Sequence, residues 1–192
     1  MASEARADID LKARCTSSVH ALRLEYVAEN VSQHPVFLFN ILHGEISEAG
    51  VYPLLETAYV ELEPDAIVVS RKLFPVPQFT MVERRNIPFV TRLLPKARVH
   101  EFINLPLPLK PFDPYRSWDD EDLTQWEEKP LVLELGYFVG APGTEELGRS
   151  YPTNHGPRPG FDVFTQSSEK LLRTGSLGKF PIAAPRGDQV PG

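Results

Sequence analysis

The chain has 192 residues, of which 42% are hydrophobic and 24% are charged, the proportions of a globular protein long enough to bury a core. Its net charge is −6 and its densest basic cluster is Glu83-Arg84-Arg85, so we expect no nucleic-acid partner, which would need a basic patch. No apolar run approaches the roughly 18 residues of a membrane helix, and we expect no membrane association.

The N-terminal residues and the cysteine count predict a cytoplasmic protein. Residues 1–15 interrupt their apolar positions with charges, unlike a signal peptide. Cys15 is the only cysteine, which excludes an internal disulfide. We divide the chain into an N-terminal extension (1–16), a β-sandwich domain (17–140) and a Pro- and Gly-rich C-terminal extension (141–192).

The first predicted strands have alternating or continuous apolar residues. In 19–29, Leu22, Leu24 and Tyr26 fall on one face and charged residues on the other, which is typical of a half-buried strand. A uniformly apolar strand follows at 36–42. The turn residues Pro64-Asp65 then separate strands predicted at 57–62 and 66–71.

The later strands are predicted on both sides of a single helix. Residues 98–105 alternate without showing which face is buried, whereas 131–139 place Leu131, Leu133 and Leu135 on one face. Between them, residues 117–126 begin with a serine cap and an acidic first turn, which predicts a short helix. Leu123 and Trp126 would share a helix face, so we expect Trp126 to be buried and Trp118 to be more exposed.

Glycine and proline become frequent after Gly140, which predicts an extended tail with short strands at 161–164 and at 170–173. About six or seven strands at short spacing predict an all-β, antiparallel β-sandwich or barrel. The predicted fold is therefore an all-β sandwich with one short helix and an extended C-terminal tail.

Two stretches resemble bacterial immunoglobulin-like β-sandwich domains. "LRLEYVAENVSQHPVFLFN" (22–40) is similar to their early hairpin, and "LLPKARVHEFINLPL" (93–107) is similar to a later turn and strand. The resemblance covers about residues 17–140 and extends to the intracellular proteinase inhibitor family. It implies an immunoglobulin-like sandwich and, as one activity, protease inhibition. The chain departs from true immunoglobulin domains because it lacks their Cys–Trp–Cys core.

The proline-rich stretch "FINLPLPLKPFDPY" (102–115) allows two interpretations. Pro108 and Pro111 form a PxxP pattern, which can dock in an aromatic groove. Proline also ends strands, because it cannot donate a hydrogen bond to a sheet. We favour the second interpretation, in which this stretch leaves a strand and crosses to another part of the sheet.

No motif in the chain predicts catalysis or metal binding. Cys15 and His20 would point to opposite faces of an extended segment, so they do not suggest a nucleophile and base. The histidines lack the spacing of metal ligands, and the acidic run at 119–122 lacks the layout of a calcium loop. We predict no catalytic residues, no metal ligands and no cofactor.

The aromatic residues of 112–126 lie in an irregular segment, where they can anchor a partner. We therefore predict a non-enzymatic protein-interaction module that binds a protein partner through Phe112, Tyr115 and Trp118. One alternative is a protease inhibitor that presents 74–80 or 106–116. Another is a small-ligand-binding barrel or an enzyme with a hidden pocket, for which Arg92, His100 and Glu101 are candidates.

Overall fold

A computed structural model describes residues 8–78, 81–82, 85–116, 118, 123–141, 143–144, 148–161 and 168–184. Within these ranges the chain forms thirteen β-strands and no α-helix. The strands are β1 (Ile9–Ser17), β2 (Ala21–Asn30), β3 (Val36–His43), β4 (Leu54–Leu55), β5 (Tyr59–Leu62), β6 (Ile67–Arg71), β7 (Phe89–Leu93), β8 (Arg98–Pro106), β9 (Gln125–Val139), β10 (Arg149–Tyr151), β11 (Arg158–Gly160), β12 (Lys170–Arg173) and β13 (Lys179–Ala184). The predicted all-β class is confirmed.

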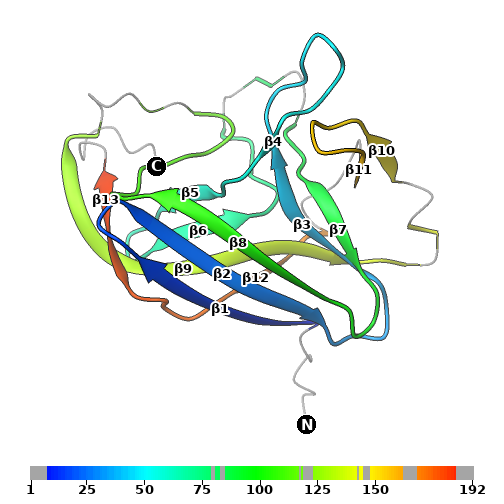
Figure 1. Cartoon of the computed structure of the whole chain (residues 1–192), viewed down its shortest axis with the longest axis horizontal. Coiled ribbons are helices and arrows are strands. Elements are labelled where there is room, and N and C mark those ends of the chain that lie inside the picture. The colour runs from blue at the N-terminus through cyan, green and yellow to red at the C-terminus, as the bar shows by residue number, and fades with distance from the viewer. Residues whose placement is uncertain are drawn as a thin grey trace.

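The strands form a small sheet, a large sheet and a separate hairpin (Figure 1). The small sheet has the order β1-β2-β8 and is antiparallel throughout. The large sheet is organised around the long strand β9. One edge of β9 pairs with β6 and then with β3, while the other edge pairs with β13 and then with β12. The β6–β9 pair is parallel, which departs from the predicted antiparallel arrangement.

The main core lies between the small sheet and the large sheet. Leu22, Leu24 and Tyr26 of β2 are at most 1% exposed and belong to the same apolar cluster as Leu133 and Leu135 of β9. These are the faces that the alternation predicts, because successive side chains of a strand point to opposite sides of its sheet. The strands predicted at 19–29, 36–42, 57–62, 66–71, 98–105 and 131–139 correspond to β2, β3, β5, β6, β8 and β9.

Both predicted extensions contribute strands to these sheets. Residues 9–17 form β1, which pairs with β2 along its whole length. In the tail, the predicted strand at 170–173 is β12, and β13 adds the fully buried Ile182 to the main core. The strand predicted at 161–164 lies outside the described residues except for Phe161. β1, β12 and β13 are therefore parts of the sheets.

The helix predicted at 117–126 is wrong for its last two residues. Gln125 and Trp126 are instead the first residues of strand β9. Residues 117 and 119–122 lie outside the described part of the chain. The expected burial of the two tryptophans is wrong: Trp126 is 60% exposed, and Trp118 is partly buried. Trp126 follows the geometry of a strand, so the helical spacing from Leu123 does not apply to it.

The proline-rich stretch crosses between two strand edges, as expected. The Leu109 amide donates to Pro181 O (3.0 Å), and the Ala183 amide donates to Leu109 O (2.8 Å), which ties this point to β13. Farther along, the Phe112 amide donates to Val60 O in β5 (2.9 Å), and the Val60 amide donates to Phe112 O (2.8 Å). In the described residues, no helix is long and apolar enough to cross a membrane.

Candidate functional site

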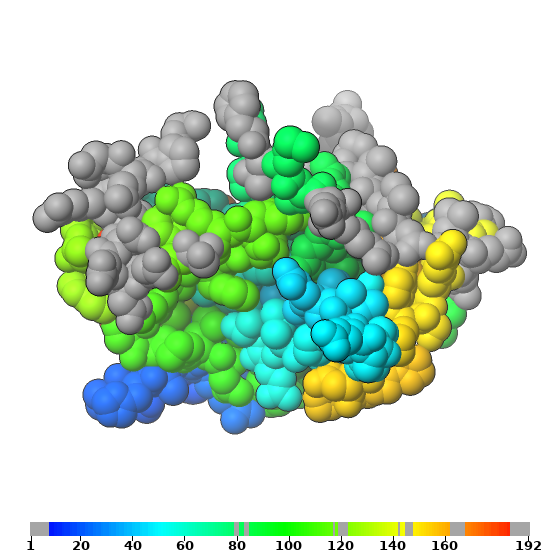
Figure 2. All heavy atoms as spheres, turned by 90° about the horizontal axis from the view of Figure 1, so that it is seen from above, coloured from blue at the N-terminus to red at the C-terminus, as the bar shows by residue number. Residues whose placement is uncertain are grey.

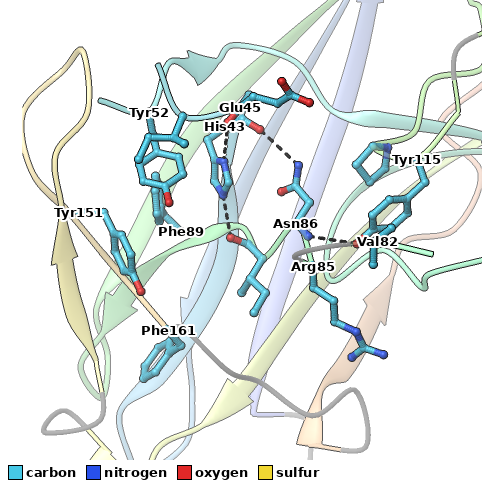
Figure 3. A pocket seen from close by; sticks show the side chains of 14 residues that line it. His43, Glu45, Tyr52, Val82, Arg85, Asn86, Phe89, Tyr115, Tyr151 and Phe161 are labelled. Atoms are coloured by element: carbon cyan, nitrogen blue, oxygen red, sulfur yellow. Dashed lines mark hydrogen bonds between the residues drawn. The ribbon is translucent and has the colours of Figure 1, made fainter. Parts of the chain in front are cut away.

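A cavity of about 600 Å³ opens at one end of the large sheet (Figure 3). We call it the aromatic pocket and define it by residues that line it, namely His43, Tyr52, Phe89, Tyr151, Phe161, Glu45, Arg85, Asn86 and Tyr115. Its size lies within the range of small-molecule and side-chain binding sites.

Four separate segments bring the rings of the pocket together. His43 ends β3, Phe89 begins β7, Tyr52 lies in the loop after β3, and Tyr151 ends β10. The loop and the β10–β11 hairpin lie side by side (Figure 2) and are joined by the Tyr52 amide, which donates to Pro152 O at 3.0 Å. A Cβ on Gly160 would come within 2.8 Å of the Phe89 ring, so a glycine is needed for β11 to lie this close.

The rings pack against one another and form the wall of the pocket. Phe89 stacks on His43 with a centroid distance of 4.5 Å and on Tyr151 at 5.2 Å. Tyr52 lies edge-on to Phe89 at 5.4 Å and to Tyr151 at 5.9 Å. Each such pair contributes about 0.5–1.5 kcal/mol beyond area burial. The wall is therefore preorganised and does not need a ligand to assemble it.

Both ring nitrogens of His43 are engaged. Nδ1 lies 2.9 Å from Gly44 O and Nε2 lies 2.9 Å from Ile87 O. A neutral imidazole can donate a hydrogen bond to only one of these two carbonyl oxygens. Each carbonyl nevertheless occupies the position next to a ring nitrogen that a substrate or a metal ion would need. His43 therefore orients the wall of the pocket and is not available as a base.

Asn86 supplies an unsatisfied acceptor beside the pocket. Its backbone amide donates to the Tyr115 hydroxyl at 3.1 Å, and its Nδ2 donates to His43 O at 3.5 Å. Its Oδ1 is buried and has no hydrogen-bond partner among the described residues. A buried acceptor without a donor costs about 1–3 kcal/mol. Because Oδ1 is closed to solvent, a ligand recovers this free energy by donating a hydrogen bond to it only if the Asn86 side chain turns toward the pocket.

The predicted site residues lie in different surroundings. Tyr115 lines the aromatic pocket. Phe112 is 37% exposed, and its ring lies 6.1 Å from that of Tyr59. The Trp118 ring carries the Arg116 guanidinium at 3.5 Å, and its Nε1 is buried without a partner among the described residues. Tyr115 is therefore the one residue of the three that the structure assigns to this pocket.

A second hollow of about 480 Å³ contains a polar network that joins the two sheets. Glu101 of β8 accepts hydrogen bonds from Tyr26 Oη at 2.5 Å, Arg71 Nη1 at 2.7 Å and Asn40 Nδ2 at 2.6 Å. Burial raises the pKa of the Tyr26 hydroxyl, which therefore remains a donor. These contacts satisfy the carboxylate and give it a structural role.

His100 and Glu101, two of the residues considered for an enzyme, do not lie in one site. His100 points away from Glu101 on the opposite face of β8, where its Nε2 lies 2.6 Å from Glu25. Burial raises the pKa of the Cys15 thiol to about 11, which disfavours the reactive thiolate. Within the part of the chain that the structure describes, no group of three His, Cys, Asp or Glu side chains is arranged to hold a metal ion.

Comparison of the chain with family models, with curated proteins and with solved structures finds no match. The candidate site is therefore identified from the arrangement of its residues alone. Sequence reasoning did not identify His43, Tyr52, Phe89 and Tyr151, because they are distant in the chain and carry no common motif. The one available signal was the concentration of aromatic residues, which drew attention to Tyr115.

Proposed function

We propose that the protein is a non-enzymatic binding module that recognises another protein by accepting an aromatic side chain into the aromatic pocket. The observation that carries the proposal is the buried, unpaired Asn86 Oδ1 next to a preorganised wall of stacked rings. A cavity of about 600 Å³ has room for a large side chain and its neighbours.

The chemistry of the pocket favours a bound aromatic side chain that carries a hydrogen-bond donor. The ring wall offers stacked and edge-on contacts, which are the geometries that aromatic pairs prefer. Asn86 Oδ1 needs a donor, and the indole N–H of tryptophan and the hydroxyl of tyrosine can each supply one. A plain phenyl ring would leave the acceptor unpaired.

The mouth of the pocket suits a peptide that extends beyond the bound ring. Glu45 and Arg85 are exposed there and offer one charge of each sign. Ile46 is 51% exposed and adds an apolar surface beside them. Charges of both signs around an apolar site complement a polypeptide better than they complement a simple anion or cation.

We also infer that the packed sheets form an immunoglobulin-like sandwich and that the protein acts in the cytoplasm. Alternating strands and the lone Cys15 support these inferences. The protease-inhibitor alternative would need a free, extended loop. Residues 109–112 do not provide one, since Leu109 and Phe112 are bonded to neighbouring strands.

The test is a peptide-display selection against the folded protein, followed by affinity measurements with each selected peptide. We expect the peptides to share a tryptophan or tyrosine, and Tyr151→Ala and Asn86→Leu to weaken binding at least about tenfold, or roughly 1.4 kcal/mol. Trp126→Ala is the matched control, because Trp126 is an exposed aromatic residue outside the pocket.

Melting curves of each variant establish that it is folded before its affinity is compared. Peptides whose affinity falls with Trp126→Ala and is insensitive to both pocket variants would contradict the proposal. Selection of peptides without aromatic residues would contradict it as well.

A further inference from the structure

Strand β1 forms one edge of the small sheet. It pairs with β2 on one side, and no described strand pairs with its other side. It is nine residues long, and Figure 1 shows it at the side of the molecule away from β10 and β11. An edge of this length presents a row of free N–H and C=O groups that can accept another strand.

The outward face of this edge has a self-complementary order of charges. Asp10, Lys12 and Arg14 alternate with inward-facing residues, so the face reads negative, positive, positive. Asp8 precedes β1 and pairs with Lys170 Nζ at 2.7 Å, whereas Lys12 pairs with Asp10 in its own chain and Arg14 pairs with Glu25. When the same strand is turned antiparallel to itself, the order reverses and the Asp10 carboxylate of each copy meets a cation of the other. Opposite charges on facing strands stabilise a pair, and like charges destabilise it.

The charges select one register. With a two-fold axis at Leu11, Asp10 of each copy faces Lys12 of the other. With the axis at Lys12, Asp10 faces Arg14 but the two Lys12 side chains face each other, and with the axis at Ala13, Lys12 faces Arg14. An axis at Asp10 would place two aspartates together. Of these four registers, the one centred on Leu11 pairs Asp10 with a cation and brings no like charges together.

The inward face of β1 also leaves apolar surface uncovered. Leu11, Ala13 and Cys15 pack against the main core but remain partly exposed. In the register centred on Leu11, the two Leu11 side chains face each other and Ala13 faces Ile9. A second copy would thus cover the open side of the core and pair the free backbone groups at once.

We propose that two copies of the chain associate through β1, antiparallel and centred on Leu11, so that their small sheets join into one continuous sheet. The contact is isologous, with the same surface on both partners, which closes the assembly at a dimer. Because β1 is remote from the hairpin that forms part of the aromatic pocket (Figure 1), the pocket stays open in the dimer.

The first test measures the mass of the protein by analytical ultracentrifugation across a concentration series. The wild type is expected to form a dimer. Asp10→Lys places like charges opposite each other at two symmetric positions, and we expect it to weaken dimerisation at least tenfold. The double variant Asp10→Lys with Lys12→Asp reverses both partners and is expected to restore the dimer.

Glu48→Lys is the matched control, because it makes the same change in net charge on an exposed residue outside β1. It is expected to leave the dimer unchanged. A wild type that stays monomeric at several hundred micromolar would overturn the proposal, and so would a dimer that Asp10→Lys leaves intact or that the double variant fails to restore.

A second test fixes the register by cross-linking in a Cys15→Ser background. Leu11→Cys places two thiols opposite each other at the two-fold axis, and mild oxidation is expected to link the chains. Ala13→Cys places its thiols four residues apart along the strands, or about 13 Å, which is beyond the Cα separation of a disulfide. Cross-linking of Ala13→Cys in preference to Leu11→Cys would exclude this register and overturn the proposal.

Discussion

Leu24 of β2 and Leu133 of β9 are fully buried and belong to the same core between the two sheets. Replacing either with alanine removes apolar contacts and leaves a cavity, so each variant should lose about 2–5 kcal/mol of unfolding free energy. Leu171 is 53% exposed, and Leu171→Ala should change stability by no more than about 0.5 kcal/mol. Urea denaturation measures all three, and equal losses would show that the strand faces are assigned wrongly.

Glu169 is a partly buried carboxyl group on the outer face of the large sheet. Its Oε1 accepts a hydrogen bond from the Leu73 amide at 2.8 Å, and any Cβ on Gly136 would overlap it. Burial raises the pKa of this carboxyl to about 7, although the Leu73 amide and Lys72 both lower it. The folded protein therefore holds a proton there that the unfolded chain, with a pKa near 4.5, has already released.

This pKa difference predicts how Glu169 affects stability with pH. Because the folded state binds more protons between about pH 4.5 and 7, its stability falls as pH rises through that range. Glu169→Gln keeps the neutral form at every pH and should remove this fall. Urea denaturation at pH 4.5 and at pH 7.5 should show a greater advantage of the variant at pH 7.5, and a greater advantage at pH 4.5 would contradict the assignment.

Among the elements, β8 and β6 are joined across the sandwich by Glu101 and Arg71. Only 8% of the Arg71 side chain is exposed, and its Nη1 lies 2.7 Å from Glu101 Oε2. Removing one partner of a buried ion pair leaves an uncompensated charge. Glu101→Ala should therefore cost about 3–5 kcal/mol of unfolding free energy.

Glu25 of β2 is the matched control, because it pairs with Arg14 and His100 on the solvent side of the small sheet. Glu25→Ala should change stability much less than Glu101→Ala, since exposed ion pairs are weak. Denaturation curves that show equal losses for the two variants would argue against a structural role for the Glu101 network.

The elements that sequence analysis predicted are those with a clear alternation of side chains. β2 and β9 have one because each has one face in the main core. β1 and β13 were not predicted as strands: the inward residues of β1, apart from the buried Ile9, are only partly buried, and β13 contains Pro181. Trp126 was misplaced for a related reason, since a helix period was applied to the start of a strand.

At the scale of the whole molecule, the aromatic pocket forms where the end of β3, the start of β7 and the β10–β11 hairpin converge. Period and composition describe one segment at a time, so they cannot predict a site that four segments assemble. The same arrangement places the open edge of β1 away from the pocket (Figure 1). The proposed partner site and the proposed dimer contact therefore lie on separate surfaces.

Binding of an aromatic side chain in the aromatic pocket is tested most directly by an NMR experiment on the protein with a tryptophan- or tyrosine-containing peptide from the display selection. Intermolecular nuclear Overhauser effects identify the protein side chains that lie against the ring of the bound peptide. We expect contacts from that ring to Tyr52, Phe89 and Tyr151. Contacts to Trp126 or Phe112, with none to the pocket, would contradict it.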